Sequence, residues 1–367
     1  MTLYVGLMSG TSMDGIDAVL LEITDSNMRV RAASARAWAP QLQRQLRRAA
    51  EDAAHFGLVE FGQLDTLVGR EFALAAEELL RASGTAASAI RAIGSHGQTV
   101  LHRPRDAAAF TLQIGDPNVI AEHLRIDVVA DFRRRDVAAG GEGAPLMPAF
   151  HLAAFGSAGH YNVVANIGGI ANVSLLRADG SVIGFDTGPG NCLLDAWSRM
   201  RRGKPFDDGG AWAATGTVQV GLLDTWLADP YFALPPPKST GRDAFSDEWF
   251  ERALRGASVP DADVQATLLE LTARSITQGL ASGGSSPQQL LVCGGGASNA
   301  TLMARLQQLL GHTRVVSTAA RGIDPQHVEG AGFAWLAHRF LTGAPGNLPS
   351  VTGARGPVPL GALYRGI

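Results

Sequence analysis

The stretch LYVGLMSGTSMDGIDAVLLEI, residues 3–23, places two apolar runs on either side of a short polar turn. The runs at residues 4–8 and 16–21 have the length of strands, and the turn between them is rich in glycine, hydroxyl and carboxylate groups. Glycine lets a backbone approach a ligand closely, and hydroxyls beside exposed N–H groups suit a phosphate. The stretch therefore predicts a strand, a loop and a strand, in which the loop is either a phosphate site or a plain hairpin turn.

A second hairpin of the same kind is expected about 150 residues further on. The segment NVVANIGGIANVSLL, residues 162–176, has two apolar runs around Gly168 and Gly169. Two such turns in one chain indicate a duplicated unit, in which each half offers backbone N–H groups to one side of the same ligand. Nucleotide phosphates held between two lobes fit this pattern.

Length and composition limit the classes of protein that remain. A chain of 367 residues suits two lobes of roughly 150 residues or more. With 46% hydrophobic residues, 18% charged residues and a net charge of -3, the chain resembles neither a disordered protein nor a basic nucleic-acid binder. Cys192 and Cys293 are the only cysteines, so neither a disulfide framework nor a zinc site is expected. We expect a soluble cytoplasmic protein without a membrane partner, because no apolar run approaches ~20 residues and no leader is visible.

Lysine is rare, which excludes one class of nucleotide site. Lys204 and Lys238 are the only lysines, and neither follows glycine and precedes serine or threonine as a Walker loop requires. No intact GxGxxG follows a strand either. Any phosphate site here must use another geometry.

The segment GSHGQTVLHRP, residues 94–104, follows an expected strand at residues 90–95. It places His96, Gln98 and Thr99 around Gly97 at the end of that strand. Such a turn could line a sugar pocket. The alternative is a loop whose polar groups satisfy their own backbone.

The segment ADFRRRD, residues 130–136, marks the expected boundary between an N-terminal lobe, residues 1–135, and a C-terminal lobe, residues 136–367. Its three arginines are either a solvated charge cluster or include one, Arg133, that points into the ligand site. Residues 138–148 are rich in glycine and proline, as a linker would be.

The segment DTGPGN, residues 186–191, follows an expected strand at residues 182–185 and precedes an expected helix at 192–201. Asp186 then stands at the carboxyl end of a strand, where open α/β sheets bind their ligands. Asn191 is better placed than Asp186 to cap the helix. We therefore expect Asp186 to take part in the chemistry.

Two further positions carry weaker signals. In CGGGASN, residues 293–299, glycines between a strand and a helix either let a flat base or ribose lie on the backbone or form a tight turn. Glu329 opens the last long helix, where a carboxylate is favoured by the helix dipole alone.

These motifs together resemble the anhydro-N-acetylmuramic acid kinases, a family of the superfamily of acetate and sugar kinases, heat-shock chaperones and actin. GLMSGTSMDGID, GSHGQTVLHRP, ADFRRRDVAAGG, NIGGIANVS, FDTGPGN, CGGGASN and VEGAGFAWLA occur in the family's order along nearly the whole chain. Two departures are visible: Glu142 stands where the family tends to have glutamine, and Gly330 where alanine is usual. Neither removes a group that the chemistry needs, although Glu142 adds a charge to a loop near the ligand.

The resemblance implies an α/β fold of two duplicated ribonuclease-H-like lobes around an ATP cleft, and a cytoplasmic homodimer that recycles cell-wall sugar. Mg²⁺ would bridge the phosphates of ATP and reach Asp14 or Asp17 through water. The implied substrate-binding residues are His96, Gln98, Thr99, Arg133 and Glu329. The implied ATP-binding residues are Gly10, Thr11, Ser12, Met13, Asp14, Gly15, Ile16, Asp17, Asn166, Gly168, Gly169, Gly294, Gly295 and Asn299.

For such a kinase, Asp186 is the expected general base. It would activate a water that attacks C1 of the anhydro sugar while O6 leaves C1 and captures the γ-phosphoryl group of ATP. Two alternatives remain at this point: an actin-like or chaperone-like ATPase without a small-molecule acceptor, and an ordinary amino sugar kinase.

Overall fold

The N-terminal hairpin forms as expected in the computed structural model, which describes residues 1–25, 27–241, 244–255, 258–284 and 286–367. β1 (Thr2–Ser9) pairs antiparallel with β2 (Gly15–Ile23), and β2 pairs antiparallel with β3 (Met28–Ala37). Apolar residues alternate between the two faces of β1, so that both faces of the sheet are buried. The hairpin therefore lies at the centre of a layered unit.

The other strands of this sheet extend it on the far side of β1. β4 pairs parallel with β1 and β6 pairs parallel with β4, which gives the order β12-β6-β4-β1-β2-β3, with β5 antiparallel to β4. The bounds are β4 (Ile90–Arg103), β5 (Phe110–Ile114), β6 (Val128–Ala130) and β12 (Ala362–Tyr364).

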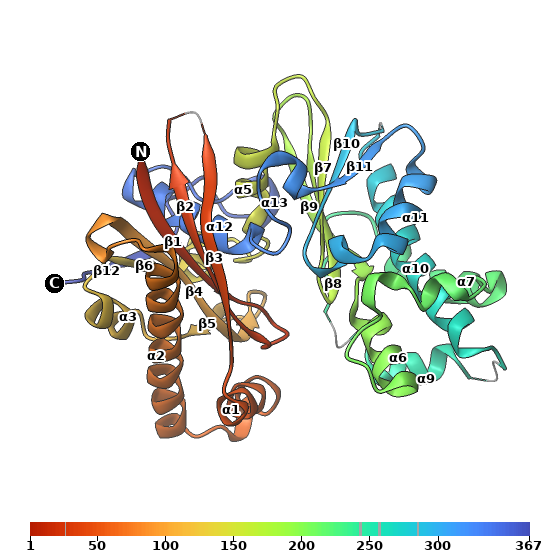
Figure 1. The fold of residues 1–367 in the computed structure, drawn as a ribbon, viewed down its shortest axis with the longest axis horizontal. Coiled ribbons are helices and arrows are strands. Elements are labelled where there is room, and N and C mark those ends of the chain that lie inside the picture. Colours follow the sequence, from red (N-terminus) through yellow and green to blue (C-terminus); the bar gives the residue numbers. More distant parts are fainter. Residues whose placement is uncertain (26, 242–243, 256–257, 285) are drawn as a thin grey trace. The chain divides into compact units, whose positions relative to one another are not determined.

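Helices cover both faces of this sheet. One face packs on α1 (Pro40–Glu51), α2 (Leu58–Ser83) and α3 (Pro117–Leu124), which supply the main hydrophobic core; α2 is the long helix beside the strands in Figure 1. The other face packs on α12 (Val328–Leu341). Gly6 permits this contact, because a Cβ there would overlap the carbonyl oxygen of Gly330. Two short helices of the same unit are α4 (Phe132–Ala138) and α13 (Pro349–Thr352), and α5 (Met147–Phe155) contains the point where the chain passes from the first unit to the second.

β4 differs from the expected strand and turn. It continues through His96 and Gln98 to Arg103 instead of ending at residue 95. Gly97 has φ +73 and a Cβ on it would lie 2.6 Å from the carbonyl oxygen of Ile114, so this glycine serves a bulge inside the strand. The polar residues of this segment therefore lie on a strand between β1 and β5, not on a loop.

The second hairpin also forms as expected, and its sheet repeats the first one. β7 (Asn162–Ile167), β8 (Ile170–Leu176) and β9 (Val182–Pro189) are antiparallel neighbours. β10 (Gln289–Cys293) and β11 (Arg314–Ser317) continue the sheet in parallel on the other side of β7. The order β11-β10-β7-β8-β9 matches β6-β4-β1-β2-β3 strand for strand. This repeat confirms the expected duplicated α/β units.

The helices of the second sheet share a core rich in aromatic residues, including Trp197, Trp226 and Trp249. Their bounds are α6 (Cys192–Arg202), α7 (Val220–Leu227), α8 (Pro230–Ala233), α9 (Asp247–Ala253), α10 (Asp261–Ala281) and α11 (Ala300–Leu310). None of the helices in the described part of the chain combines the length and the hydrophobicity needed to cross a membrane.

The chain divides into a first unit, Met1–Phe150 with His327–Ile367, and a second unit, His151–Gln326. The expected division at residue 135 differs from this in two ways. The first unit continues through the expected linker, because buried Asp136 ties that segment to the C-terminal part of the chain. Residues 327–367 return to the first unit, because α12 packs on its sheet.

Candidate functional site

The turn between β1 and β2 is fixed by bonds to its carbonyl groups. Gly10 O accepts from Met13 N at 3.1 Å and from Gln98 Nε2 at 3.1 Å, and Met13 O accepts from Gln43 Nε2 at 2.8 Å. No acceptor among the described residues takes the N–H of Thr11 or Ser12. The turn is thus held through its carbonyls and keeps two donors for another partner.

The predicted residues of this turn and of the start of β2 differ in their exposure to solvent. Thr11, Asp14 and Asp17 are exposed, whereas Met13 and Ile16 have buried side chains in the core. Gly10 and Ser12 are half-buried, and a Cβ on Gly15 would lie 2.6 Å from the carbonyl oxygen of Arg36. Met13 and Ile16 can therefore meet a ligand only through their backbone, and Gly15 is needed for contact with β3.

Gln98 supports the turn from below. Its side chain is fully buried; Oε1 lies 2.7 Å from the Ser9 hydroxyl and Nε2 donates to Gly10 O and, at 3.2 Å, to Thr99 O. Thr99 Oγ1 accepts from Gln113 Nε2 at 3.2 Å. Both ends of the Gln98 amide are bonded to protein atoms. The residue therefore stabilises the β1–β2 turn.

His96 is buried next to Gln98 and is held as a neutral imidazole. Its Nδ1 lies 2.8 Å from Gly97 O, and its Nε2 accepts from Arg133 Nε at 2.8 Å, so the proton is on Nδ1. The ring also packs 4.6 Å from the ring of Phe333. Burial, and next the charge of Arg133, lower the pKa of His96 well below its usual range.

Arg133 is the one member of the arginine run that turns inward. Its Nη1 donates to Gly143 O at 2.9 Å, whereas Arg134 pairs with Asp131 at 3.3 Å and Arg135 is exposed. Burial lowers the pKa of Arg133, and the carboxylates of Glu329 and Asp136 raise it. The structure thus brings His96, Arg133 and Glu329 into one polar group of the first unit.

Asp186 lies inside β9 and not at its end, because the strand continues to Pro189. Its Oδ2 accepts from Thr240 N at 2.9 Å and from Ser239 Oγ at 3.1 Å. Burial raises the pKa of Asp186, and the Thr240 N–H and the Ser239 hydroxyl lower it in part. The carboxylate is therefore held at one oxygen in a setting that increases its affinity for a proton.

The expected cap of α6 is absent. Asn191 precedes α6, but its Nδ2 donates to Ile167 O at 3.1 Å and its side chain makes no cap bond. Asp186, five residues earlier on β9, makes no cap bond either. Neither residue is explained as a helix cap.

The second hairpin turn points its carbonyls at the start of α6. Gly168 O accepts from Asn191 N at 2.8 Å, and Gly169 O accepts from Gly190 N at 2.9 Å and Cys192 N at 3.1 Å. In a trans peptide the N–H opposes the C=O, so the N–H of Gly169 points away from α6. This turn, like the first, is fixed through its carbonyls.

The glycine-rich turn after β10 is tightly packed. Gly294 has φ +75, and a Cβ on it would lie 2.5 Å from Asn166 Oδ1. Gly295 begins a short 3₁₀ turn, and Asn299 caps α11 by accepting from Leu302 N at 2.9 Å. Asn166 and Gly294 are thus neighbours, while the Asn299 side chain has a structural role.

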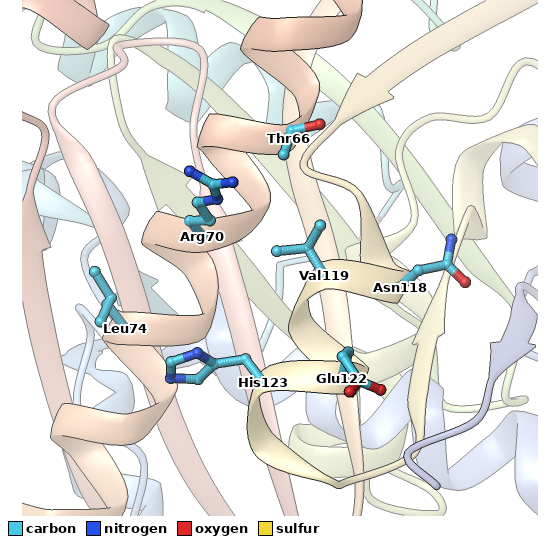
Figure 2. A pocket seen from close by; sticks show the side chains of 7 residues that line it. All are labelled: Thr66, Arg70, Leu74, Asn118, Val119, Glu122 and His123. Atoms are coloured by element: carbon cyan, nitrogen blue, oxygen red, sulfur yellow. The ribbon is translucent and has the colours of Figure 1, made fainter.

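The described residues of each unit line a hollow. The hollow of the second unit, about 430 Å³, lies between α10, α11 and residues 213–218; the residues that matter here are Glu270, Thr301, Arg305 and Gln308. The hollow of the first unit, about 570 Å³, is an open groove between α2 and α3 that includes Arg70, Asn118 and His123 (Figure 2). No residue of the predicted site lines the groove in Figure 2.

A family model described as anhydro-N-acetylmuramic acid kinase matches residues 2–366. The chain belongs to this kinase family. It is 54% identical over 365 residues to a protein of that name from Xanthomonas oryzae pv. oryzae, covering 99% of this chain and 97% of the relative. It is 53% identical to one from Pseudomonas paraeruginosa, covering 98% of each.

Among solved structures, one similar chain is an activator of 2-hydroxyisocaproyl-CoA dehydratase from Clostridium difficile with bound ADPNP. The identity is 12%, the TM-score is 0.46, and the similarity covers 91% of this chain and 93% of that one. The fold described above rests on the strand order of the two sheets.

Glu142 and Gly330, the two positions expected to depart from the family's pattern, both have local contacts in the structure. Glu142 forms a bidentate pair with Arg105, with Nε to Oε1 at 2.9 Å and Nη2 to Oε2 at 3.2 Å, so its added charge is compensated. Gly330 lies on α12 against Val19, whose Cγ2 would be 2.5 Å from a Cβ at this position. The smaller residue leaves room for the valine.

Sequence reasoning missed the residues that hold this kinase's polar groups. Asp136 is fully buried and accepts from Gly143 N at 2.8 Å, Asn347 Nδ2 at 2.8 Å and Thr352 Oγ1 at 2.9 Å. In the sequence, only its position next to the three arginines pointed to Asp136. Ser239 and Thr240, which bind Asp186, lie in a proline-rich segment that carried none.

The structure was also compared with the needs of a metal ion. The described residues contain no group of three or more histidine, cysteine, aspartate or glutamate side chains that could hold an ion. Asp14 is an exposed carboxylate in the first turn, and Asp17 is an exposed carboxylate on β2, two residues after the start of that strand. They suit an ion that keeps most of its own waters.

Proposed function

We propose that this protein is a kinase that uses ATP to open the 1,6-anhydro bridge of anhydro-N-acetylmuramic acid and to phosphorylate O6. The product is N-acetylmuramic acid 6-phosphate, an intermediate in the recycling of peptidoglycan. The observation that carries this proposal is the family match over residues 2–366, together with 54% identity to a relative of that name.

The chemistry of the substrate defines what the protein must supply. The anhydro sugar has no free 6-hydroxyl, so the C1–O6 bond must break before or while O6 receives a phosphoryl group. Water attacks C1 and loses a proton, O6 leaves C1, and O6 takes the γ-phosphoryl group of ATP with release of ADP. The C1 side resembles glycoside hydrolysis and needs a base, whereas phosphoryl transfer needs positioning and charge neutralisation.

Asp186 is the proposed base for the attacking water. Its Oδ2 accepts hydrogen bonds from Thr240 N and Ser239 Oγ, whereas no hydrogen bond from the described residues reaches Oδ1. A base works best when its pKa is near the operating pH, and burial raises the pKa of Asp186 in that direction. Oδ1 is then the atom that accepts the proton.

The two hairpin turns are the proposed phosphate sites. Thr11 and Ser12 offer N–H groups at the first turn, and Gly169 offers one at the second. Backbone N–H groups of this kind bind phosphate oxygens well. We place the adenosine of ATP at the glycine-rich turn after β10, and its base in the hollow of the second unit, which Thr301 and Arg305 help to line.

The sugar is proposed to meet the polar group of His96, Arg133 and Glu329, with Thr99 beside it. His96 has its proton on Nδ1, and the Arg133 guanidinium retains donors beyond those given to His96 and Gly143. Such a group suits hydroxyl, amide and carboxylate oxygens. Gln98 contributes indirectly, through the turn that it supports.

Mg²⁺ is the proposed ion of the bound nucleotide. Asp14 and Asp17 would hold it, directly or through its waters, because Asp14 is an exposed carboxylate in the first turn and Asp17 is one on β2 close to that turn. When bound, the ion neutralises the charge on the phosphates. A homodimer in the cytoplasm is proposed from the family resemblance, and light scattering of the purified protein tests the dimer.

Release of ADP distinguishes this proposal from the ATPase alternative. The kinase should release ADP only when anhydro-N-acetylmuramic acid is present, whereas an actin-like or chaperone-like ATPase should not require the sugar. N-acetylmuramic acid, which has a free 6-hydroxyl, serves as the comparison for an ordinary amino sugar kinase. Faster turnover of that open sugar than of the anhydro sugar would contradict the proposal.

Product made in oxygen-18 water tests the bond that breaks. Opening of the bridge by water places one solvent oxygen on C1, and mass spectrometry detects the added mass of about two units. The sample is read promptly, before exchange at the anomeric carbon alters the label. A product without the label would exclude hydrolytic opening.

A further inference from the structure

Four hydrogen bonds join Asp186 to residues 231–240, a segment that lies 45 to 54 residues further along the chain. Thr240 N and Ser239 Oγ donate to Oδ2 of its carboxylate, at 2.9 Å and 3.1 Å. Its backbone N–H donates to Lys238 O at 3.0 Å, and its carbonyl accepts from Tyr231 Oη at 2.7 Å. Both the main chain and the side chain of Asp186 are thus held by one segment.

This segment covers the free edge of the second sheet. β9 is the last strand in the order β11-β10-β7-β8-β9, so no strand of the described residues lies on one side of its backbone. The bond from Asp186 N to Lys238 O satisfies that edge at the position of the carboxylate. The segment therefore fixes Asp186 as a further strand would, and in addition supplies side-chain donors.

Lys238 links this segment to α8. Its Nζ donates to Tyr231 O at 3.0 Å and to Phe232 O at 3.2 Å, and it lies 4.5 Å from the centre of the Tyr231 ring. The ammonium group thus binds the two carbonyls of α8 next to the tyrosine whose hydroxyl holds Asp186 O. Lys238 is one of only two lysines in the chain.

The two donors act on one oxygen of the carboxylate. A hydrogen bond to a carboxylate stabilises its charged form, so Ser239 and Thr240 oppose the effect of burial on the proton affinity of Asp186. They also fix the rotamer in which Oδ1 is left for the water. The ionisable side chains of residues 231–240 are Tyr231, which donates to Asp186 O, and Lys238, which donates to the carbonyls of α8. Burial first, and next the charge of Asp186, raise the pKa of Tyr231 and keep it a donor.

We propose that residues 238–240 form a positioning segment for the base, in which the Ser239 hydroxyl and the Thr240 N–H orient Asp186 and limit its proton affinity. This inference rests on the proposed function, in which Asp186 accepts the proton of the attacking water. Residues 238–240 bind the base, and in this proposal they do not contact the reacting atoms.

The test replaces Ser239, because its side chain is exposed and we therefore expect the fold to be retained when it is shortened. In S239A the acid limb of the kcat/KM profile, which reports the base in the free enzyme, should move to higher pH by about 0.5–1 unit. The direction follows because loss of a donor to the carboxylate raises the pKa of Asp186. S239T keeps the hydroxyl and should restore the wild-type limb.

S282A is the matched control, because Ser282 is also an exposed serine of the second unit and its hydroxyl donates to Gly279 O within its own helix turn. An acid limb of S239A that coincides with that of S282A would overturn the proposal. So would a fall in rate that is uniform across pH, since that outcome indicates a structural effect alone.

D186N separates this inference from the proposed function. If D186N is inactive and S239A leaves the profile unmoved, the positioning role is wrong and the base assignment stands. If D186N turns over at the wild-type rate, the base assignment fails, and with it the positioning role.

Discussion

Asp136 Oδ2 accepts the backbone N–H of Gly143 at 2.8 Å, and the carbonyl of the same glycine accepts from Arg133 Nη1 at 2.9 Å. One buried carboxylate therefore determines where the Arg133 guanidinium lies. Because Asp136 Oδ1 also accepts from Asn347 and Thr352, the same carboxylate joins residues 139–143 to the C-terminal part of the first unit. The polar group at His96 depends on a contact more than 200 residues away in sequence.

Asp136→Asn should lower both stability and sugar affinity. Asparagine has one acceptor oxygen, so its NH₂ group must face either the N–H of Gly143 or the donors of Asn347 and Thr352. A buried donor that loses its acceptor costs about 1–3 kcal/mol of unfolding free energy. Urea unfolding measures this loss, and the KM for the anhydro sugar should rise as Arg133 loses its support. D106N, at an exposed aspartate, is the control; equal stability of the two variants would contradict the role of Asp136.

The stability of the protein should fall in mild acid, in part because of His151. Burial lowers the pKa of His151 to about 3, while an unfolded histidine has a pKa of about 6.5. Below pH ~6.5 the unfolded chain binds a proton that the folded chain does not, so stability is fully present above this pH. It is lost as the pH falls from ~6.5 toward about 3, at up to ~1.4 kcal/mol per pH unit.

His151→Gln removes this titration and should flatten the dependence of unfolding free energy on pH between 7.5 and 5. The variant should be less stable at pH 7.5, because it loses the imidazole bond to Ser174 Oγ. Urea unfolding at four pH values measures the slope. H160Q, at an exposed histidine, should keep the wild-type slope. Parallel curves for wild type and H151Q would show that His151 does not contribute.

Local patterns predicted the hairpin at the centre of each sheet. Both hairpins have apolar runs of strand length around glycine turns, and the residues that form them are neighbours in sequence, so spacing alone was enough. The inward direction of Arg133 was one of two alternatives that the sequence left open. The position of Asp186 on β9 was predicted to within the length of the strand, since β9 runs on to Pro189.

The remaining features depend on contacts between distant segments. Gly97 looks like a turn residue, but tertiary pairing of β4 with β5 uses its positive φ inside a strand. The return of α12 to the first unit depends on Gly6, whose missing side chain is meaningful only once the helix lies on it. Ser239 and Asp186 are 53 residues apart, and no periodicity connects them.

Gly10→Val should weaken ATP binding without affecting the fold. The nearest atom to a Cβ on Gly10 is Ser12 Oγ at 3.8 Å, so the side chain has room in the protein but would stand where phosphate is proposed to meet the turn. Calorimetry should give a Kd for ATP at least about tenfold weaker, or ~1.4 kcal/mol. Unchanged affinity would count against the first turn as a phosphate site.

Gly15→Ala is the companion variant, with the opposite pattern. A Cβ on Gly15 would lie 2.6 Å from the carbonyl oxygen of Arg36, so β2 and β3 must separate. Its melting temperature should fall, while G10V should melt with the wild type. If both variants melted early, the loss of ATP binding in G10V could be assigned to unfolding instead of to the turn.

Asp186→Asn should abolish turnover while fold and ligand binding are retained. Asparagine keeps an oxygen that accepts from Thr240 N, and its backbone keeps the bonds to Lys238 and Tyr231, so the melting temperature should stay close to that of the wild type. It cannot accept the proton of the attacking water. Loss of a general base costs ~10²–10⁴-fold in rate, and here we expect the upper end, because the same proton removal allows both attack on C1 and departure of O6.

The base and structural roles of Asp186 diverge on this variant. As a purely structural residue, Asp186 would be replaced by asparagine with little loss, since Thr240 N would still have its acceptor. If Asp186 is the base, its replacement by asparagine lowers kcat, while the KM values for ATP and sugar change little. A single-turnover assay with excess enzyme measures the chemical step directly. A near wild-type rate there would refute the base assignment, and a low rate with early melting would indicate that the four bonds of Asp186 serve the fold.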